Sequence, residues 1–317
     1  MEWVLVSLGL VILLLAGDAL VRGAVNLSLR IGIPALIVSL TIVAFGTSAP
    51  ELLISLQAAL KGAPGIAMGN VVGSNTANIL LVLGIPAILA TLHTSHCNTR
   101  RTYLFMIAAS ILFICLSYRG IFTFWSGVVL LSALAFVLGD AFMAARKHRK
   151  EARGLVVEDE EELEGADPDM PWWRIIVFLV LGLVGLPLGA DLMVDNAEVI
   201  ARRYGVSEVV IGLTLVALGT SLPELATTVM AALRRQADVA LGNVIGSNMF
   251  NLLAIIGITS IVAPIPVDIE ELEFDLFVML GASILIVPFV FFRQDINRVW
   301  GIALTLMYLT YVMIVLS

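Results

Sequence analysis

The chain has 317 residues, of which 60% are hydrophobic and 14% are charged. A soluble domain carries roughly 45–50% apolar and 25% charged residues, so this composition excludes a water-soluble enzyme. The formal net charge of −7 comes largely from residues 151–169, which hold nine acids, and no basic stripe is present that would bind nucleic acid. We therefore expect an all-α polytopic membrane protein.

Apolar stretches separated by charges and turn residues predict ten transmembrane helices. In chain order they cover residues 3–21, 31–60, 66–91, 102–118, 121–144, 173–200, 207–233, 239–263, 275–292 and 299–316. One long hydrophilic segment interrupts the series. It divides the chain into a first transmembrane repeat at 1–145, an acidic linker at 146–170 and a second transmembrane repeat at 171–317.

The two halves repeat each other at a constant offset of 173 residues. GTSAPE at 46–51 aligns with GTSLPE at 219–224, and GNVVGSNTAN at 69–78 aligns with GNVIGSNMFN at 242–251, with five of six and seven of ten positions identical. Each half has five predicted spans, an odd number, so the second half must enter the membrane from the opposite side. Inverted repeats are typical of transporters, whose binding site lies near the midplane between the repeats.

Basic residues predict the orientation, because they are retained on the cytoplasmic side of a membrane. With the N-terminus outside, 14 basic residues lie at inner ends and four, Lys61, Arg119, Arg202 and Arg203, at outer ends. We expect a multi-pass protein of the cell (plasma or inner) membrane with a cytoplasmic linker. Three further acids, Asp18, Asp140 and Asp191, are predicted near helix ends at the membrane interface.

A carboxylate lies at the same place within an apolar segment of each repeat, Glu51 in the first and Glu224 in the second. An ionised acid at the bilayer centre costs about 2.5–3.5 kcal/mol on translocon-insertion scales, so such residues usually face a site and have a partner. No basic residue accompanies either glutamate within its span. The natural partner is therefore a bound cation.

Polar neighbours at helical spacing place more oxygen atoms beside each glutamate. Prolines follow the serines, at Pro50 and Pro223, and should kink both helices because they lack a backbone N–H. The next motif adds a second polar face in each repeat, and its glycines allow close helix packing. The residues on these faces are Ala44, Thr47, Ser48, Ser74 and Asn78 in the first repeat and Ala217, Thr220, Ser221, Ser247 and Asn251 in the second.

Carboxylate, hydroxyl, amide and carbonyl oxygens without cysteine or histidine suit calcium or sodium far better than zinc or copper. We therefore expect calcium and sodium as transported ions and no resident cofactor. The chain has no GxxxxGK[ST] loop, so coupling to ATP is not expected. No nucleophile or histidine accompanies the two acids, so we do not expect an enzyme.

The duplicated motifs GTSAPE with GNVVGSNTAN and GTSLPE with GNVIGSNMFN resemble the alpha-repeats of the cation/calcium exchanger superfamily, here at 44–84 and 217–257. The chain is similar to its compact prokaryotic sodium/calcium exchangers over nearly its whole length. Several family members carry an aspartate where this chain has Asn251, so this centre holds two formal negative charges instead of three. The resemblance implies calcium ligands at Glu51, Glu224, Thr47 and Thr220, flanking sodium sites at Ala44, Ser48, Ser74, Ala217, Ser221 and Ser247, and a centre lined by Asn78 and Asn251.

These observations favour a secondary active antiporter that exchanges calcium for sodium by alternating access, with the bilayer and the ions as its partners and a monomer as the functional unit. A calcium/proton antiporter is the first alternative, in which the two glutamates would carry the protons. A passive cation channel could use the same acids as a ring. A purely structural or receptor membrane protein is the remaining alternative, against which the duplicated midplane acids argue.

Overall fold

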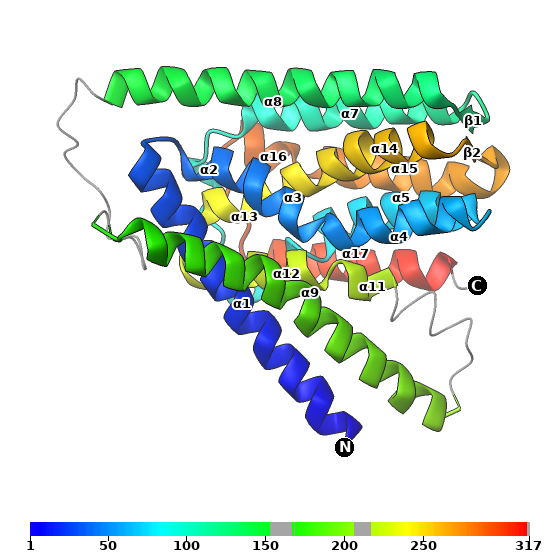
Figure 1. Ribbon diagram of the computed structural model, residues 1–317, viewed down its shortest axis with the longest axis horizontal. Helices are drawn as coiled ribbons and strands as arrows, with labels where there is room; N and C mark the ends of the chain where they lie inside the picture. The colour runs from blue at the N-terminus through cyan, green and yellow to red at the C-terminus, as the bar shows by residue number, and fades with distance from the viewer. Residues whose placement is uncertain (153–166, 168, 206–216, 316–317) are drawn as a thin grey trace.

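The computed structural model describes residues 1–152, 167, 169–205 and 217–315. Most helices run along the long axis of the bundle in Figure 1, whereas α1 (Glu2–Ile31) and α9 (Trp172–Arg203) cross it obliquely. The other described elements of the first repeat are α2 (Ala35–Val38), η1 (Ser39–Val43), α3 (Ala44–Thr47), α4 (Ala49–Leu60), α5 (Pro64–Leu80), α6 (Gly84–Leu89), η2 (Thr94–His96), α7 (Arg100–Ser117), β1 (Ile121–Phe122) and α8 (Phe124–Ala152). Those of the second are α11 (Ala217–Thr220), α12 (Leu222–Leu233), α13 (Ala237–Met249), η4 (Phe250–Ile255), α14 (Ile256–Val262), β2 (Ile265–Pro266), α15 (Ile269–Leu285), α16 (Val287–Phe291) and α17 (Arg298–Val315).

The all-α membrane fold expected from the sequence is confirmed. Within the described ranges, eight helices are long and apolar enough to cross a membrane, and nine if the bent pair of residues 35–47 and 49–60 counts as one span. The remaining predicted span, 207–233, begins in residues outside the described part of the chain and continues as α11 and α12. The described helices therefore agree with a series of ten.

Contacts between loops show that the two repeats are inverted. The loop after α6 bridges to the loop before α17 through Leu92 and Ile296. The loop after α6 leads into the start of α7, where Arg101 pairs with Asp140 in the C-terminal half of α8. At the opposite end, β1 and β2 pair antiparallel, with Ile121 facing Pro266. The 173-residue offset relates the first loop to β2 and the second loop to β1. Equivalent loops thus lie at opposite ends, as an inverted repeat requires.

Helices α1 and α9 pack against each other in antiparallel fashion through small residues. A Cβ atom added at Gly9 would lie 2.9 Å from the Gly189 carbonyl oxygen, and one added at Gly182 would lie 2.5 Å from Leu20 Cβ. Glycine permits this close approach, which is how helices associate where lipid provides no hydrophobic drive. Helix α1 continues ten residues beyond its predicted span of 3–21, whereas α9 agrees with its predicted span of 173–200 within three residues. The two helices are followed by equivalent left-handed glycines, Gly32 (φ 68°) and Gly205 (φ 78°).

The observed helix bounds correct two placements. Asp18 and Asp191 lie in the middle of α1 and α9, because each helix continues for more than ten residues past the aspartate. Asp18 forms ion pairs with Arg22, at 3.0 Å, and with Arg234 at the end of α12. The sequence placed Asp18 at the membrane interface, whereas in the structure two arginines of the protein are its partners.

Helix α8 continues to Ala152, so residues 146–152 of the predicted linker are helical. The residues there are mostly strong helix formers, and the helix extends past its apolar part for that reason. Asp140, six residues before this extension, pairs with Arg101 of α7. The rest of the predicted linker, apart from 167, 169 and 170, lies outside the described residues.

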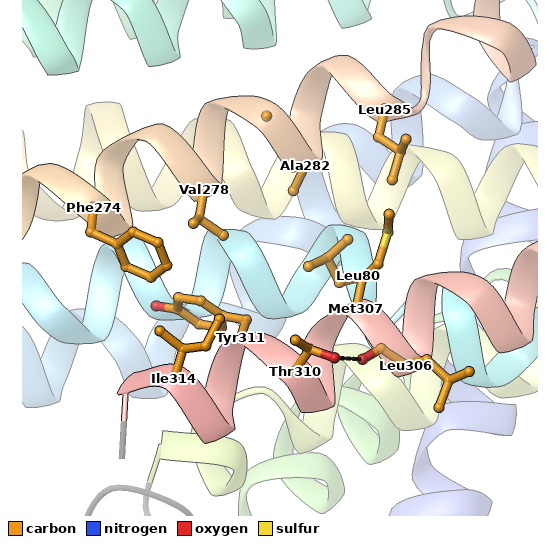
Figure 2. A pocket seen from close by; sticks show the side chains of 11 residues that line it. Leu80, Phe274, Val278, Ala282, Leu285, Leu306, Met307, Thr310, Tyr311 and Ile314 are labelled. Atoms are coloured by element: carbon orange, nitrogen blue, oxygen red, sulfur yellow. Dashed lines mark hydrogen bonds between the residues drawn. The ribbon is translucent and has the colours of Figure 1, made fainter. Parts of the chain in front are cut away.

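Figure 2 shows a cavity of about 450 Å³ between α15 and α17, with Leu80 of α5 at its base. The lining is apolar except for Thr310 and Tyr311. Val278 contributes to the wall, and its equivalent in the first repeat is Phe105, whose ring packs edge-on against Phe136 at 5.9 Å. The larger side chain fills the corresponding space between α7 and α8. This cavity has no converging polar groups and is not the candidate site.

Candidate cation-binding site

The two GTS-x-PE motifs break their helices in the same way. Ser48 separates α3 from α4 with φ −84° and ψ 5°, and Ser221 separates α11 from α12 with φ −89° and ψ 2°. The first pair of helices bends by 44°. Proline two residues after each serine has no N–H to continue the preceding helix, so the predicted kinks are confirmed.

Each break places its glutamate in the first turn of a new helix, Glu51 in α4 and Glu224 in α12. The exposed fraction is 1% for Glu51 and 0% for Glu224. The two glutamates belong to one buried cluster, because Ser48, three residues before Glu51, hydrogen-bonds to Glu224. The N-terminus of a helix is its positive end and lowers the energy of each carboxylate, but this contribution is only a fraction of a unit charge.

The hydrogen bonds of the two carboxylates differ. Ser48 Oγ donates to Glu224 Oε1 at 3.2 Å, and Ser247 Oγ donates to the same oxygen at 3.5 Å. The other oxygen of Glu224 and both oxygens of Glu51 have no hydrogen-bond donor within the described residues. Neither glutamate forms an ion pair in the described chain, whose ion pairs all involve other acids. Three buried carboxylate oxygens thus have neither a hydrogen-bond donor nor a positive partner among the described residues.

Neutral oxygen atoms surround the two acids. Thr47 Oγ1 lies 3.4 Å from Ser247 Oγ, a contact between the two repeats. Ser221 Oγ, Asn78 Oδ1 and both polar atoms of Asn251 are buried and have no partner in the described chain. Of the other predicted residues, Ala44, Ser74 and Thr220 are buried, and Ala217 lies in α11.

Close packing of helices brings these groups together. A Cβ atom added at Gly246 of α13 would lie 2.6 Å from the Leu40 carbonyl oxygen and 2.6 Å from Ala44 Cβ, and one added at Gly242 would lie 2.8 Å from the Leu36 carbonyl oxygen. The predicted packing role is confirmed for these two glycines, but it is wrong for their equivalents in the first repeat, because a Cβ atom added at Gly69 or Gly73 would meet no described atom within 4 Å. Gly242 and Gly246 allow α13 of the second repeat to lie directly on η1 and α3 of the first.

Two asparagines that the sequence reasoning did not select hold the glutamate helices. Asn70 Nδ2 donates to the Glu51 carbonyl oxygen at 3.2 Å and to Ser55 Oγ at 2.9 Å. Asn243 Nδ2 donates to the Glu224 carbonyl oxygen at 3.3 Å and to the Thr228 hydroxyl at 3.1 Å. Their identity in both copies of the GNV motif is the signal that could have identified them.

Burying an ionised group without a partner is costly. Removing one partner of a buried ion pair destabilises a protein by several kcal/mol. A cation at the centre would satisfy the unpaired carboxylate, amide and hydroxyl oxygens together. Among the described residues, no three histidine, cysteine or acidic side chains converge as a metal cluster. Two glutamate charges together with neutral oxygen ligands suit a transported cation, which must be released as well as bound.

A membrane-spanning inverted repeat with paired buried carboxylates defines a secondary transporter, of the class of cation antiporters. The family described as sodium/calcium exchanger protein matches residues 1–142 and 174–317. The chain belongs to this family.

Named relatives agree with this assignment. The chain is 31% identical over 347 aligned residues to the sodium/calcium exchanger MaX1 of Methanosarcina acetivorans, covering 99% of this chain and 98% of the relative. It is 35% identical over 284 residues to the inner membrane protein YrbG of Escherichia coli, covering 89% and 86%. A structure of the sodium-calcium exchanger NCX_Mj, soaked with 2.5 mM Na⁺ and 1 mM Sr²⁺, matches with a TM-score of 0.82 at 30% identity, covering 98% of this chain and 97% of that chain.

Proposed function

We propose that this protein exchanges calcium for sodium across the cell membrane by alternating access. The observation that carries the proposal is the pair of buried glutamates, Glu51 and Glu224, which come from inverted repeats and lack a basic partner in the described chain. Two carboxylates neutralise one Ca²⁺. More than two Na⁺ replacing that calcium would leave excess positive charge, so exchange at such a ratio is electrogenic.

The ligands divide into a centre and its flanks. Glu51, Glu224, Thr47 and Thr220 form the calcium centre, lined by Asn78 and Asn251. Sodium ions use the flanking oxygens around Ala44, Ser48, Ser74, Ala217, Ser221 and Ser247. The burial of the described polar side chains and the unpaired oxygens at the centre support this assignment. Calcium prefers 6–8 oxygen ligands, and sodium uses the same chemical type, so the two ions compete for shared atoms.

Asymmetry between the repeats supports alternating access. At the linker end, α1 packs on α12, and a Cβ atom added at Gly17 would lie 2.9 Å from the Ala226 carbonyl oxygen. The residue of α4 equivalent to Ala226 is Leu53, whose exposed fraction is 59%. We call the contact of α1 with α12, and the equivalent contact of α9 with α4, the two gates. The first gate is closed, and the second is not. Exchange of these contacts between the repeats would open the site to the other side.

The relative position of the linker and the basic loops supports the predicted orientation. The loops that contain Leu92 and Ile296 lie at the end of the bundle where α7 begins, and Arg101 of that end pairs with Asp140 in the part of α8 that leads to the linker. We place this end in the cytoplasm and the N-terminus outside, and the gate closed here is then the cytoplasmic one. A single chain contains both repeats and the whole centre, so the monomer is the functional unit.

Purified protein in sodium-filled vesicles tests the proposal. The vesicles are diluted into sodium-free buffer with labelled calcium, and uptake is compared with that under an imposed pH gradient without sodium. We expect uptake that requires the outward sodium gradient. Uptake that follows the pH gradient and ignores sodium would establish the calcium/proton antiporter instead, and calcium entry without any counter-ion would indicate a channel.

A further inference from the structure

Two buried amides, Asn75 of α5 and Asn248 of α13, cross-link the repeats beside the candidate site. Asn75 Nδ2 donates to the Asn248 carbonyl oxygen at 3.4 Å, and Asn248 Nδ2 donates to the Asn75 carbonyl oxygen at 3.4 Å. The second contact of each Nδ2 atom is also equivalent, since Asn75 faces the sulfur of Met279 and Asn248 that of Met106. The pair therefore follows the pseudo-twofold relation between the repeats.

One further hydrogen bond connects this pair to the centre. Asn78 Nδ2 donates to Asn248 Oδ1 at 3.0 Å. The nitrogen and the oxygen of an amide occupy opposite branches of one carbon, so fixing the nitrogen also fixes the oxygen. Asn78 Oδ1 is buried and has no hydrogen-bond donor in the described chain. Asn248 thereby presents Asn78 with its amide oxygen free to act as a ligand.

The equivalent hydrogen bond in the other half is not formed. It would run from Asn251 Nδ2 to Asn75 Oδ1, and both atoms are buried and without a partner among the described residues. Asn75, Asn248 and Asn251 are each at most 1% exposed, so water does not replace the missing bond easily. Two unpaired atoms that match each other indicate a bond that another conformation forms.

We propose that Asn248 is a positioning residue for Asn78 and that Asn75 holds the same role for Asn251 in the opposite conformation. Each crossing amide orients the central amide of the other repeat, with the oxygen toward the ion. The amide at position 251 is essential to this arrangement, because an ionised aspartate there would have no N–H to donate to Asn75. The inference rests on the proposed function for the identity of the ion.

Double-mutant cycles with calcium binding as the readout test the positioning role. Calcium affinity of purified, full-length protein is measured for Asn248→Leu, Asn78→Ala and the double variant. A neutral hydrogen bond contributes about 1 kcal/mol, so we expect Asn248→Leu to weaken calcium binding about fivefold. In the Asn78→Ala background the same substitution should have little further effect, because its target is absent.

Asn75→Leu is the matched control. It removes an amide of equal burial and the crossing hydrogen bond that Asn75 Nδ2 donates to the Asn248 carbonyl oxygen, but it leaves the bond from Asn78 to Asn248 intact. Its effect on calcium affinity should therefore multiply with that of Asn78→Ala. If the losses of calcium affinity caused by Asn248→Leu and Asn78→Ala also multiply in the double variant, the proposal is overturned. Asn248 would then act only on the structure.

Asn248→Asp keeps the test decisive if the leucine variant does not fold. It retains an acceptor for the Asn78 amide, and we expect calcium affinity to be kept, whereas an about fivefold loss of calcium affinity relative to wild type in Asn248→Asp contradicts the positioning role. Sodium-driven uptake is measured in the same preparations. Coupled calcium binding without sodium-driven uptake would refute the antiport but leave the positioning role standing.

Discussion

The ion pair between Asp18 and Arg234 ties the middle of α1 to the end of α12 at the linker end of the molecule. Only 19% and 16% of the two side chains are exposed. Replacing Arg234 with Gln leaves Asp18 its second partner, Arg22 at 3.0 Å, so the loss is close to one charge-assisted hydrogen bond. Such bonds contribute about 1.5–3 kcal/mol, so the closed gate should open roughly 10 to 150 times more often in the variant.

Hydrogen–deuterium exchange of α12 amides in lipid nanodiscs, without sodium or calcium, measures this opening directly. We expect exchange in α12 to accelerate by that factor in Arg234→Gln. Lys61, the equivalent residue of the first repeat, is the matched control, because no ion pair of Lys61 is found in the described chain. Unchanged exchange in Arg234→Gln, or an equal acceleration in Lys61→Gln, would refute the reasoning.

Two further substitutions test how the site is held. Asn243→Ala removes the bonds to the Glu224 carbonyl and to Thr228, and since each is worth about 1 kcal/mol the melting temperature should fall by several degrees and calcium-induced stabilisation should weaken; an unchanged melting curve would contradict this. Gly246→Ala introduces a methyl group 2.6 Å from the Leu40 carbonyl oxygen. Overpacking costs about 1–3 kcal/mol, so thermal unfolding should show clear destabilisation, whereas Gly139→Ala, which meets no described atom within 4 Å, should not.

Much of the fold could be predicted from the sequence because bilayer thickness fixes the length of a spanning helix. The repeat with its odd number of spans predicted the inversion, and proline chemistry predicted the breaks at Ser48 and Ser221. The length of α1 was underestimated, since this helix continues past its predicted end through charged residues such as Arg22 and Arg30. The partner of Asp18, Arg234, comes from a distant part of the chain, and no local pattern reveals it.

The candidate site was predictable in its composition but not in its connections. Each motif residue has an equivalent in the other repeat, so the sequence describes a symmetric site. The structure is asymmetric: Ser48 donates to Glu224, whereas its equivalent, Ser221 Oγ, has no partner in the described chain. A single conformation breaks the symmetry that the repeated sequence contains. This asymmetry belongs to one conformation of the protein. It therefore appears in the three-dimensional structure and not in the repeated sequence.

The central claim is that Glu51 and Glu224 together bind the transported calcium. Calcium titration of purified protein, wild type against Glu51→Gln and Glu224→Gln, tests it most directly, with Asp191→Asn as a control that removes a carboxylate from α9 outside the site. The account predicts that each Gln variant loses high-affinity calcium binding while remaining folded, and that Asp191→Asn retains it. Calcium binding of wild-type affinity in either glutamine variant would contradict the account.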